Sequence, residues 1–199
     1  MKRKLFKGLF ASAIVLFASA ATLLSQEYNA DREKTLVKWE GKGVGKAHNG
    51  TIEVKSGTLY LEAGLPVRGE VVVDMTSMVN LDLDSESMKE RLIGHLKSDD
   101  FFSVADYPEA HFTITSSELK DGRVHLRGDL KIKGKSHPAE VASEMSAVGD
   151  DYRFTGMLEF DRSLYDVRFG SGKFFDNLGD KLISDIITLD FEFFVKEAK

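Results

Sequence analysis

The stretch RVHLRGDLKIK, Arg123 to Lys133, alternates without a break. Every even-numbered position is apolar or glycine, and every odd-numbered position is charged or histidine. A repeat of two residues is typical of a β-strand that has one face against an apolar interior and the other in water. The stretch therefore predicts a strand at the surface of an apolar core.

The same alternation returns in residues 151–161, with Met157 as the single exception, and a third apolar face is formed by Ile187, Leu189, Phe191, Phe193 and Val195. Shorter runs rich in β-branched and apolar residues predict further strands. These runs are Thr35–Val44, Thr51–Val54, Thr58–Leu61, Gly69–Met75, Phe112–Ser116 and Glu140–Met145. Turn-forming dipeptides separate several of them: Asn49-Gly50, Ser56-Gly57, Asp121-Gly122 and Gly149-Asp150. About eight or nine antiparallel strands joined by hairpins predict an all-β barrel or sandwich.

One short helix is predicted among the strands, near Ser85 to Ile93. Met88, Leu92 and Leu96 fall at intervals of four residues, so one side of this helix is expected to pack on the sheet. Asp84 or Ser85 is placed to cap its start, and Gly94 to end it in the left-handed conformation.

The chain begins with a segment unlike the rest. Four basic residues within Met1–Lys7 precede an uncharged apolar run, Leu9–Leu24, with small residues at Ala18-Ser19-Ala20 and at Ser25. This is the pattern of a secretory signal peptide, which we place at residues 1–25, with cleavage after Ala20 or Ser25. An uncleaved membrane anchor is the alternative, although a spanning helix needs about 20 apolar residues. We expect a periplasmic or secreted protein with one domain, residues 26–199.

The net charge and the absence of cysteine limit the kinds of partner and membrane attachment that the protein is expected to have. Removing residues 1–20 deletes four basic residues and no acidic ones, so the formal charge of −5 falls by four to −9. Such an acidic domain is not expected to bind nucleic acid or an anionic membrane surface. The sequence contains no cysteine, which excludes a lipoprotein anchor and means that burial must supply the stability.

An exported all-β chain could also be an outer-membrane barrel, so its two faces must be assigned. The charged face of residues 123–133 would cost about 2–4 kcal/mol for each Arg or Lys turned toward lipid. In water it costs nothing, so the apolar faces are expected to point inward, with no stable membrane span after signal cleavage. An eight-stranded barrel can be filled by its own side chains or hold one small ligand.

Several stretches together resemble the YceI-like family of exported, lipocalin-like barrels. They are GEVVVDMTSM (69–78), HLKSDDFF (95–102), YPEAHF (107–112), LRGDLKIKGK (126–135) and FDRS (160–163), and they span the mature chain in order. The resemblance implies an antiparallel β-barrel of about eight strands that binds an isoprenoid or another lipid-like molecule. It does not fix the lipid, since Ile93-Gly94 stands where many relatives have Arg-Asp, and a first-strand histidine of some relatives is absent.

The candidate ligand-binding residues are the inward faces of the strands, with three residues outside them. His95 follows the predicted helix end, where it can stabilise the helix, contact a ligand headgroup or bind a metal. Phe174 and Phe175 lie in the last long loop, as a candidate lid. Phe101 and Phe102 belong either to the core or to the barrel mouth. The strand candidates are Val71, Val73, Phe112, Ile114, Leu126, Leu130, Phe154, Leu158, Phe160, Leu189 and Phe191.

Catalytic and metal sites are not predicted. The sequence has no G-x-S-x-G motif, and its five histidines show no H-x-H, H-x-x-x-H or H-E-x-x-H spacing. His111, His125 and His137 are expected to be exposed, and His48 to be structural. We therefore expect a carrier or sequestering protein for an apolar lipid-like molecule, without a cofactor, and a homodimer is left open. The alternatives are a side-chain-filled barrel acting as an interaction or stress-response module, and an enzyme with an acid–base pair inside the cavity.

Overall fold

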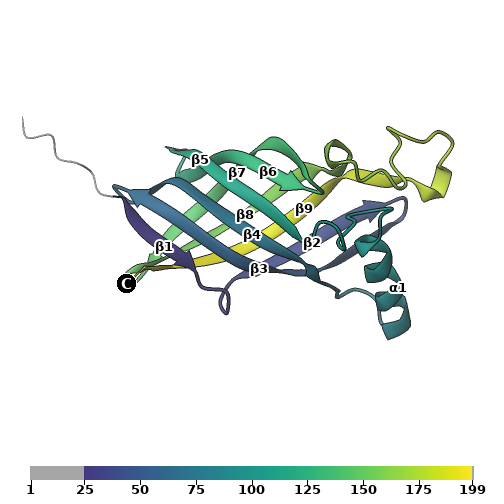
Figure 1. Cartoon of the computed structure of the whole chain (residues 1–199), viewed down its shortest axis with the longest axis horizontal. Helices are drawn as coiled ribbons and strands as arrows, with labels where there is room; N and C mark the ends of the chain where they lie inside the picture. Colours follow the sequence, from purple (N-terminus) through teal and green to yellow (C-terminus); the bar gives the residue numbers. More distant parts are fainter. Residues whose placement is uncertain (1–24, 199) are drawn as a thin grey trace, which may run out of the picture.

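The computed structural model describes residues 25–198, which form a closed antiparallel β-barrel with one α-helix (Figure 1). The helix α1 spans Glu86–Lys97, and the short 3₁₀ helices η1 and η2 span Arg162–Tyr165 and Gly179–Lys181. The strands are β1 (Gln26–Ala30), β2 (Leu36–Gly43), β3 (Lys46–Glu62), β4 (Leu65–Asn80), β5 (Glu109–Lys120), β6 (Arg123–Ile132), β7 (Lys135–Val148), β8 (Asp151–Asp161) and β9 (Ile183–Glu197).

The barrel has eight positions around its wall, although the described residues hold nine strands. From β2 the order runs through β9, β8, β7, β6, β5 and β4 to β3, which pairs with β2 again. The ninth strand, β1, shares the position of β2: it pairs with β3 through residues 58–61 and with β9 through residues 195–197. The prediction of an all-β barrel with about eight strands is confirmed.

Two of the four predicted turns are confirmed and two are wrong. Asp121-Gly122 joins β5 to β6, and Gly149-Asp150 joins β7 to β8, whereas Asn49-Gly50 and Ser56-Gly57 both lie inside β3. The glycines of β3 allow close packing instead. A Cβ on Gly50 would stand 1.8 Å from the carbonyl oxygen of Val79. Thr51–Val54 and Thr58–Leu61 are therefore parts of one long strand.

The predicted helix is confirmed and begins where it was expected to, but its C-terminal end was wrongly assigned. Ser85 is the N-cap residue, yet its hydroxyl bonds Ser87 rather than the helix backbone. Gly94 lies inside α1, which continues to Lys97 and ends at Ser98, whose amide donates to the carbonyl of His95 (3.1 Å). Leu92 and Leu96 pack against the core as expected, whereas Met88 is 56% exposed.

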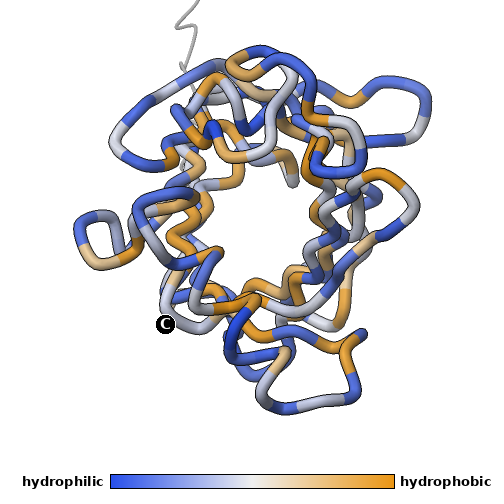
Figure 2. The backbone as a smooth tube through the Cα atoms, turned by 90° about the vertical axis from the view of Figure 1, so that its right-hand side faces the viewer, coloured by the Kyte–Doolittle hydropathy of each residue, from blue (hydrophilic) through white to orange (hydrophobic). Residues whose placement is uncertain are grey.

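The two ends of the barrel differ. α1, the β2–β3 hairpin and the segment between β8 and β9 lie at one end, on the right of Figure 1. Viewed from that end, hydrophobic and hydrophilic residues alternate around the ring of the wall (Figure 2). At the opposite end, Leu61 and Val195 are buried, and the rings of Tyr28 and Tyr152 meet edge to face at 5.2 Å. Side chains therefore pack the end near β1, whereas the α1 end carries the site.

Candidate functional site

A cavity of about 370 Å³ lies inside the barrel wall, toward the end that carries α1. This volume falls within the range of about 300–1,000 Å³ that is usual for small-molecule pockets. Side chains therefore do not fill the whole interior, contrary to the side-chain-filled alternative. The predicted inward faces line the cavity: Val71, Val73, Phe112, Ile114, Leu126, Leu130, Phe154, Leu158, Phe160, Leu189 and Phe191.

His95 lines the cavity as well, whereas Phe174 and Phe175 do not. Both phenylalanines lie between η1 and η2 and are exposed, by 40% and 50%. Phe174 instead lies 5.0 Å from the guanidinium of Arg168, at a cation–π distance. Alternation could not place these two residues because they belong to no strand.

Several cavity residues were not predicted. Val37 and Trp39 come from β2, and Ile52 and Val54 come from β3, where the two internal glycines concealed the period-two pattern. The indole of Trp39 donates to the carbonyls of Thr51 (3.2 Å) and Val79 (3.1 Å). Phe101 and Phe102 follow α1, and both are buried in the core while also lining the cavity, so the two alternatives for this pair coincide.

Exposed residues locate the mouth of the cavity. Of its lining residues, Lys42, Lys46 and Phe169 are exposed, and all three belong to the α1 end of the barrel. Lys46 and His48 share the inner face of β3 with Ile52 and Val54, since these positions alternate. The cavity is therefore apolar within the barrel and acquires polar groups at its opening.

His48 is held by Asp82, whose carboxylate accepts from its Nδ1 (2.8 Å) and from the amide of Asn49 (2.8 Å). Burial acts to raise the pKa of Asp82, but the hydrogen bonds from Asn49, His48 and Asn80 outweigh it and lower that pKa. His48 thus fastens the end of β4 to β3, which is the structural role expected for it.

His95 lies in the last turn of α1, where a basic side chain favours the helix dipole. Its ring meets the rings of Phe101 and Phe169 edge to face, at 5.0 and 4.5 Å, and its Nε2 lies 3.6 Å from a carboxylate oxygen of Asp100. These contacts join α1, the turn that follows it and the β8–β9 segment at one side of the mouth.

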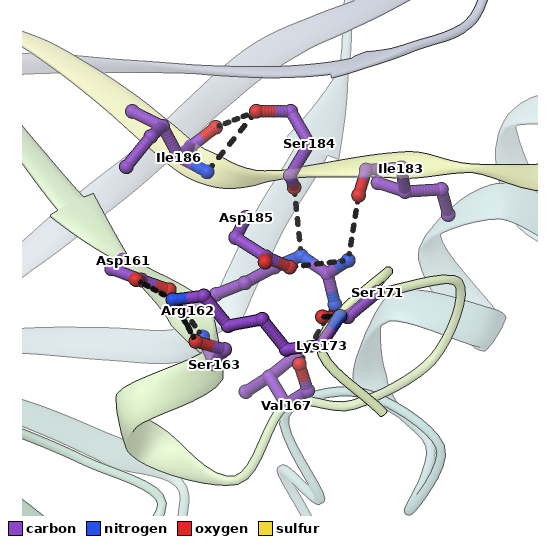
Figure 3. Close-up of polar contacts among 10 residues, drawn as sticks. All are labelled: Asp161, Arg162, Ser163, Val167, Ser171, Lys173, Ile183, Ser184, Asp185 and Ile186. Atoms are coloured by element: carbon purple, nitrogen blue, oxygen red, sulfur yellow. Dashed lines mark hydrogen bonds and ion pairs between the residues drawn. The ribbon is translucent and has the colours of Figure 1, made fainter. Parts of the chain in front are cut away.

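The β8–β9 segment is anchored by a buried arginine (Figure 3). The side chain of Arg162 is 0% exposed and donates to the carbonyls of Val167 (2.7 Å), Ser184 (2.9 Å) and Ile183 (3.1 Å). Asp185 lies 3.4 Å away as its ion-pair partner. Burial lowers the pKa of Arg162, while Asp185 and Asp161 act to raise it. The guanidinium therefore holds both ends of the segment.

A second cation, Lys133, connects two segments at the mouth of the cavity. Lys133 has a left-handed backbone conformation (φ 48°) in the β6–β7 turn, and its ammonium donates to the carbonyls of Phe101 (2.8 Å), Asp99 (3.1 Å) and Asp166 (3.2 Å). Since an ammonium has three donors, these bonds satisfy it. Lys133 ties the turn after α1 to the β8–β9 segment.

The remaining three histidines are half-buried, whereas they were expected to be exposed. His111 and His125 bond the carboxylates of Glu70 (3.2 Å) and Glu140 (2.8 Å), and His111 is also among the residues that line the cavity. His137 is half-buried rather than exposed, because its ring packs on Tyr165 (5.1 Å) and its Nε2 bonds the carbonyl of Leu164 (3.0 Å).

The chemistry of the wall suits binding. Among the described residues that line the cavity, none carries a carboxylate or a hydroxyl group. Within residues 25–198, no three His, Asp or Glu side chains gather in a group that could hold a metal ion. What the wall offers is apolar surface with amine and imidazole groups at one end.

The model of the YceI-like domain family matches residues 28–195, which is most of the described barrel. The chain belongs to the YceI-like family. Protein YceI of Escherichia coli O157:H7 is 28% identical over 154 residues, covering 76% of each chain. The family predicted from the sequence is therefore confirmed.

Two solved structures share the fold of this YceI-like protein. BcnA of Burkholderia cenocepacia superposes with a TM-score of 0.65 at 20% identity, covering 84% of this chain and 99% of BcnA. A polyisoprenoid binding domain of Saccharophagus degradans, implicated in plant cell wall breakdown, gives a TM-score of 0.60 at 15% identity, covering 86% and 98%. In the part of the chain that the structure describes, no helix has the length and apolarity needed to cross a membrane.

Proposed function

We propose that this YceI-like protein is a binding protein that holds a lipid-like or isoprenoid molecule inside its barrel, as a carrier or a sequestering protein, without enzymatic activity or a cofactor. The observation that carries the proposal is the cavity of about 370 Å³, whose wall is apolar and whose polar groups gather at the mouth. The polyisoprenoid binding domain of Saccharophagus degradans has the same fold and supports this class of ligand.

Burial of apolar chain would supply the affinity. Each methylene group removed from water contributes about 0.8 kcal/mol, so about ten of them contribute on the order of 8 kcal/mol before the costs of ordering the ligand. A polar or charged head would stay at the mouth, near Lys46, His48 and His95, because desolvating it inside the barrel would be costly.

We further propose that residues 1–25 are a signal peptide and that residues 26–199 are the mature domain in the periplasm or outside the cell. Residues 1–24 of this signal segment lie outside the described residues. Cleavage after Ala20 or Ser25 would leave β1 intact, since this strand begins at Gln26.

Native mass spectrometry of the gently purified protein, followed by solvent extraction, tests the binding. We expect a mass increment from one copurifying apolar molecule, released on extraction. Gly41→Leu should abolish it, because Gly41 lines the cavity and a Cβ there would only touch the flexible end of Ile187 at 3.5 Å. The added side chain thus occupies the cavity.

Lys38→Leu is the matched control, since Lys38 is exposed on the outer face of the same strand. The control should keep the bound molecule. A wild-type protein that carries no apolar molecule and takes up none from lipid extracts would contradict the proposed function.

A further inference from the structure

The loop Arg168–Leu182, here named the mouth loop, extends beyond the barrel at the end where the cavity opens. Figure 1 shows this loop reaching furthest along the long axis, beside the start of β9. It exposes four large apolar side chains: Phe169 (42%), Phe174 (40%), Phe175 (50%) and Leu182 (40%). Of these four residues only Phe169 lines the cavity, so the exposure of the other three is not explained by ligand binding inside the barrel.

The mouth loop is built to hold this shape. Its Gly170 carbonyl accepts from the amide of Ile183 (2.8 Å), its Leu182 carbonyl accepts from the amide of Val44 (3.2 Å), and Ser171 is fully buried. Arg162 fixes the backbone on both sides of the loop. The exposed rings are therefore presented by an anchored loop, and Val44, itself exposed, adds to the same apolar surface.

The charge of the mouth loop differs from that of the whole chain. It contains three basic residues, Arg168, Lys173 and Lys181, and two acidic ones, Asp176 and Asp180, whereas the chain has a formal charge of −5. An acidic protein is repelled by a negatively charged lipid surface, and a nearly neutral apolar loop is its least repelled part. The loop suits a neutral bilayer surface, where apolar insertion is the main attraction.

We propose that the mouth loop is a membrane-docking surface that inserts Phe174 and Phe175 into the outer part of a lipid bilayer. This inference rests on the proposed function, since docking would bring the cavity mouth against the lipid from which an apolar ligand must come. An apolar molecule could then enter the barrel without crossing water, which would otherwise oppose its transfer.

A bilayer fits this surface better than a protein partner. A stable protein interface buries about 800 Å² on each side and needs a complementary shape. The mouth loop instead projects as an apolar tip, and its cations Arg168 and Lys173 are already paired with Asp166 and Asp161, which precede the loop. A fluid bilayer accepts such a tip without any matching pocket.

Flotation of the full mature protein with phosphatidylcholine vesicles tests the proposal. We expect the wild type to bind, and Phe174→Ser with Phe175→Ser to weaken binding about tenfold or more, because two exposed rings lose their apolar burial. Since apolar insertion is weakly screened, the wild-type binding should persist in high salt. Phosphatidylglycerol vesicles should bind less protein than phosphatidylcholine vesicles.

The matched control is Leu119→Ser with Val148→Ser, two exposed apolar residues at the opposite end of the barrel, and it should bind vesicles like the wild type. Equal vesicle binding by the loop variant and the wild type would overturn the proposal. So would sedimentation data in which the loop substitutions only dissociate a dimer, since the surface would then bind a second copy.

Native mass spectrometry separates docking from ligand holding. The loop variant should still retain an extractable apolar molecule, because Phe174 and Phe175 do not line the cavity. If the wild type never carried such a molecule but bound vesicles through the mouth loop, the proposed function would fail and docking would stand.

Discussion

Arg162 is a cation without solvent contact, placed where two segments of the chain meet. Three backbone carbonyls and Asp185 surround its guanidinium, so it satisfies groups that would otherwise be buried without partners. A planar fork of donors suits this task better than the single ammonium of lysine. The residue thus acts on the shape of the mouth rather than on a ligand.

Replacing Arg162 by Met should lower the free energy of unfolding by about 3–5 kcal/mol, since Asp185 and three carbonyls lose their partner inside the protein. Urea unfolding followed by tryptophan fluorescence measures this change. Arg123→Met is the control, because Arg123 pairs with Glu144 (3.0 Å) on the exposed face and should matter little. Equal unfolding midpoints for the two variants would contradict the role of Arg162.

Gly94 allows a second test at the residue scale, of whether it lies inside α1 or ends it. The sign of the change in the free energy of unfolding distinguishes these two positions. Inside α1, a Cβ at Gly94 would meet nothing within 4 Å, so Gly94→Ala should raise the free energy of unfolding by about 0.5–1 kcal/mol. Had Gly94 ended the helix in the left-handed conformation, alanine would have destabilised the protein instead. Thermal unfolding by circular dichroism distinguishes the two outcomes.

Gly122→Ala is the matched control for that substitution. Its Cβ would also meet nothing within 4 Å, but its backbone has φ +76°, so alanine there should cost about 1 kcal/mol or more. A loss of stability in both variants would mean that the helix ends before Gly94.

Single residues also show where sequence reasoning reaches its limit. Leu126, Leu130 and Phe154 could be placed on the inner wall because a strand repeats every two residues. Phe174 and Arg162 could not be placed, because their positions depend on how one long segment folds against others. Arg162 follows the inner face of β8, yet a buried cation can be recognised only once its carbonyl partners are known.

At the scale of elements, β1 completes the wall beside β2, and the loop that joins the two strands carries the buried Asp31. The carboxylate of Asp31 lies 2.9 Å from the ammonium of Lys196 in β9, and Lys34 lies 3.6 Å away. The bond from Lys196 lowers the pKa of Asp31 more than burial raises it, and Lys34 adds to the lowering. This pair joins the first element of the barrel to the last.

The lowered pKa predicts how this closure depends on pH. A carboxyl group whose pKa is lower in the folded state stabilises the protein above its unfolded pKa of about 3.9 and loses that effect as the pH falls through the folded value. Asp31→Asn should therefore destabilise the protein by about 1 kcal/mol at pH 7, since Lys196 is half exposed.

Urea unfolding from pH 7 down to pH 3 measures the effect of Asp31→Asn. The difference from the wild type should begin to shrink below about pH 4, where Asp31 takes up a proton in the unfolded state first, and it should keep shrinking until the pH passes the lowered pKa of the folded state. Glu33→Gln, an exposed neighbour in the same loop, should follow the wild type throughout. A constant difference across this range would exclude the ion pair as its cause.

The elements differed in how well the sequence predicted them. The regular strands β6, β8 and β9 were recognised from alternation, and β5–β6 and β7–β8 from their turns. β3 was divided in two because Gly50 and Gly57 look like turn residues, although they serve close packing. β1 was missed, because its five residues form a strand only through pairing with β3 and β9.

At the scale of the whole molecule, the barrel combines a packed end with an open one. The strand pattern predicted a barrel or a sandwich, and the family resemblance selected the closed barrel. The cavity could not be predicted from the sequence, because its volume of about 370 Å³ is a small difference between the space within the wall and the side chains that enter it. Whether a ligand occupies this cavity determines whether the barrel acts as a binding protein.

The content of the cavity should affect the stability of the entire barrel. A ligand that binds only the folded state at a concentration of 100 times its dissociation constant stabilises it by about 2.7 kcal/mol. For a domain of this size, removing that ligand should lower the melting temperature by about 5–10 °C. Differential scanning calorimetry of the purified protein before and after solvent extraction measures the shift, and adding the extract back should reverse it. Gly41→Leu, whose cavity is occupied by its own side chain, should melt at one temperature under all three conditions. Should extraction remove a lipid from the wild type without lowering its melting temperature, that lipid would not have been bound inside the barrel.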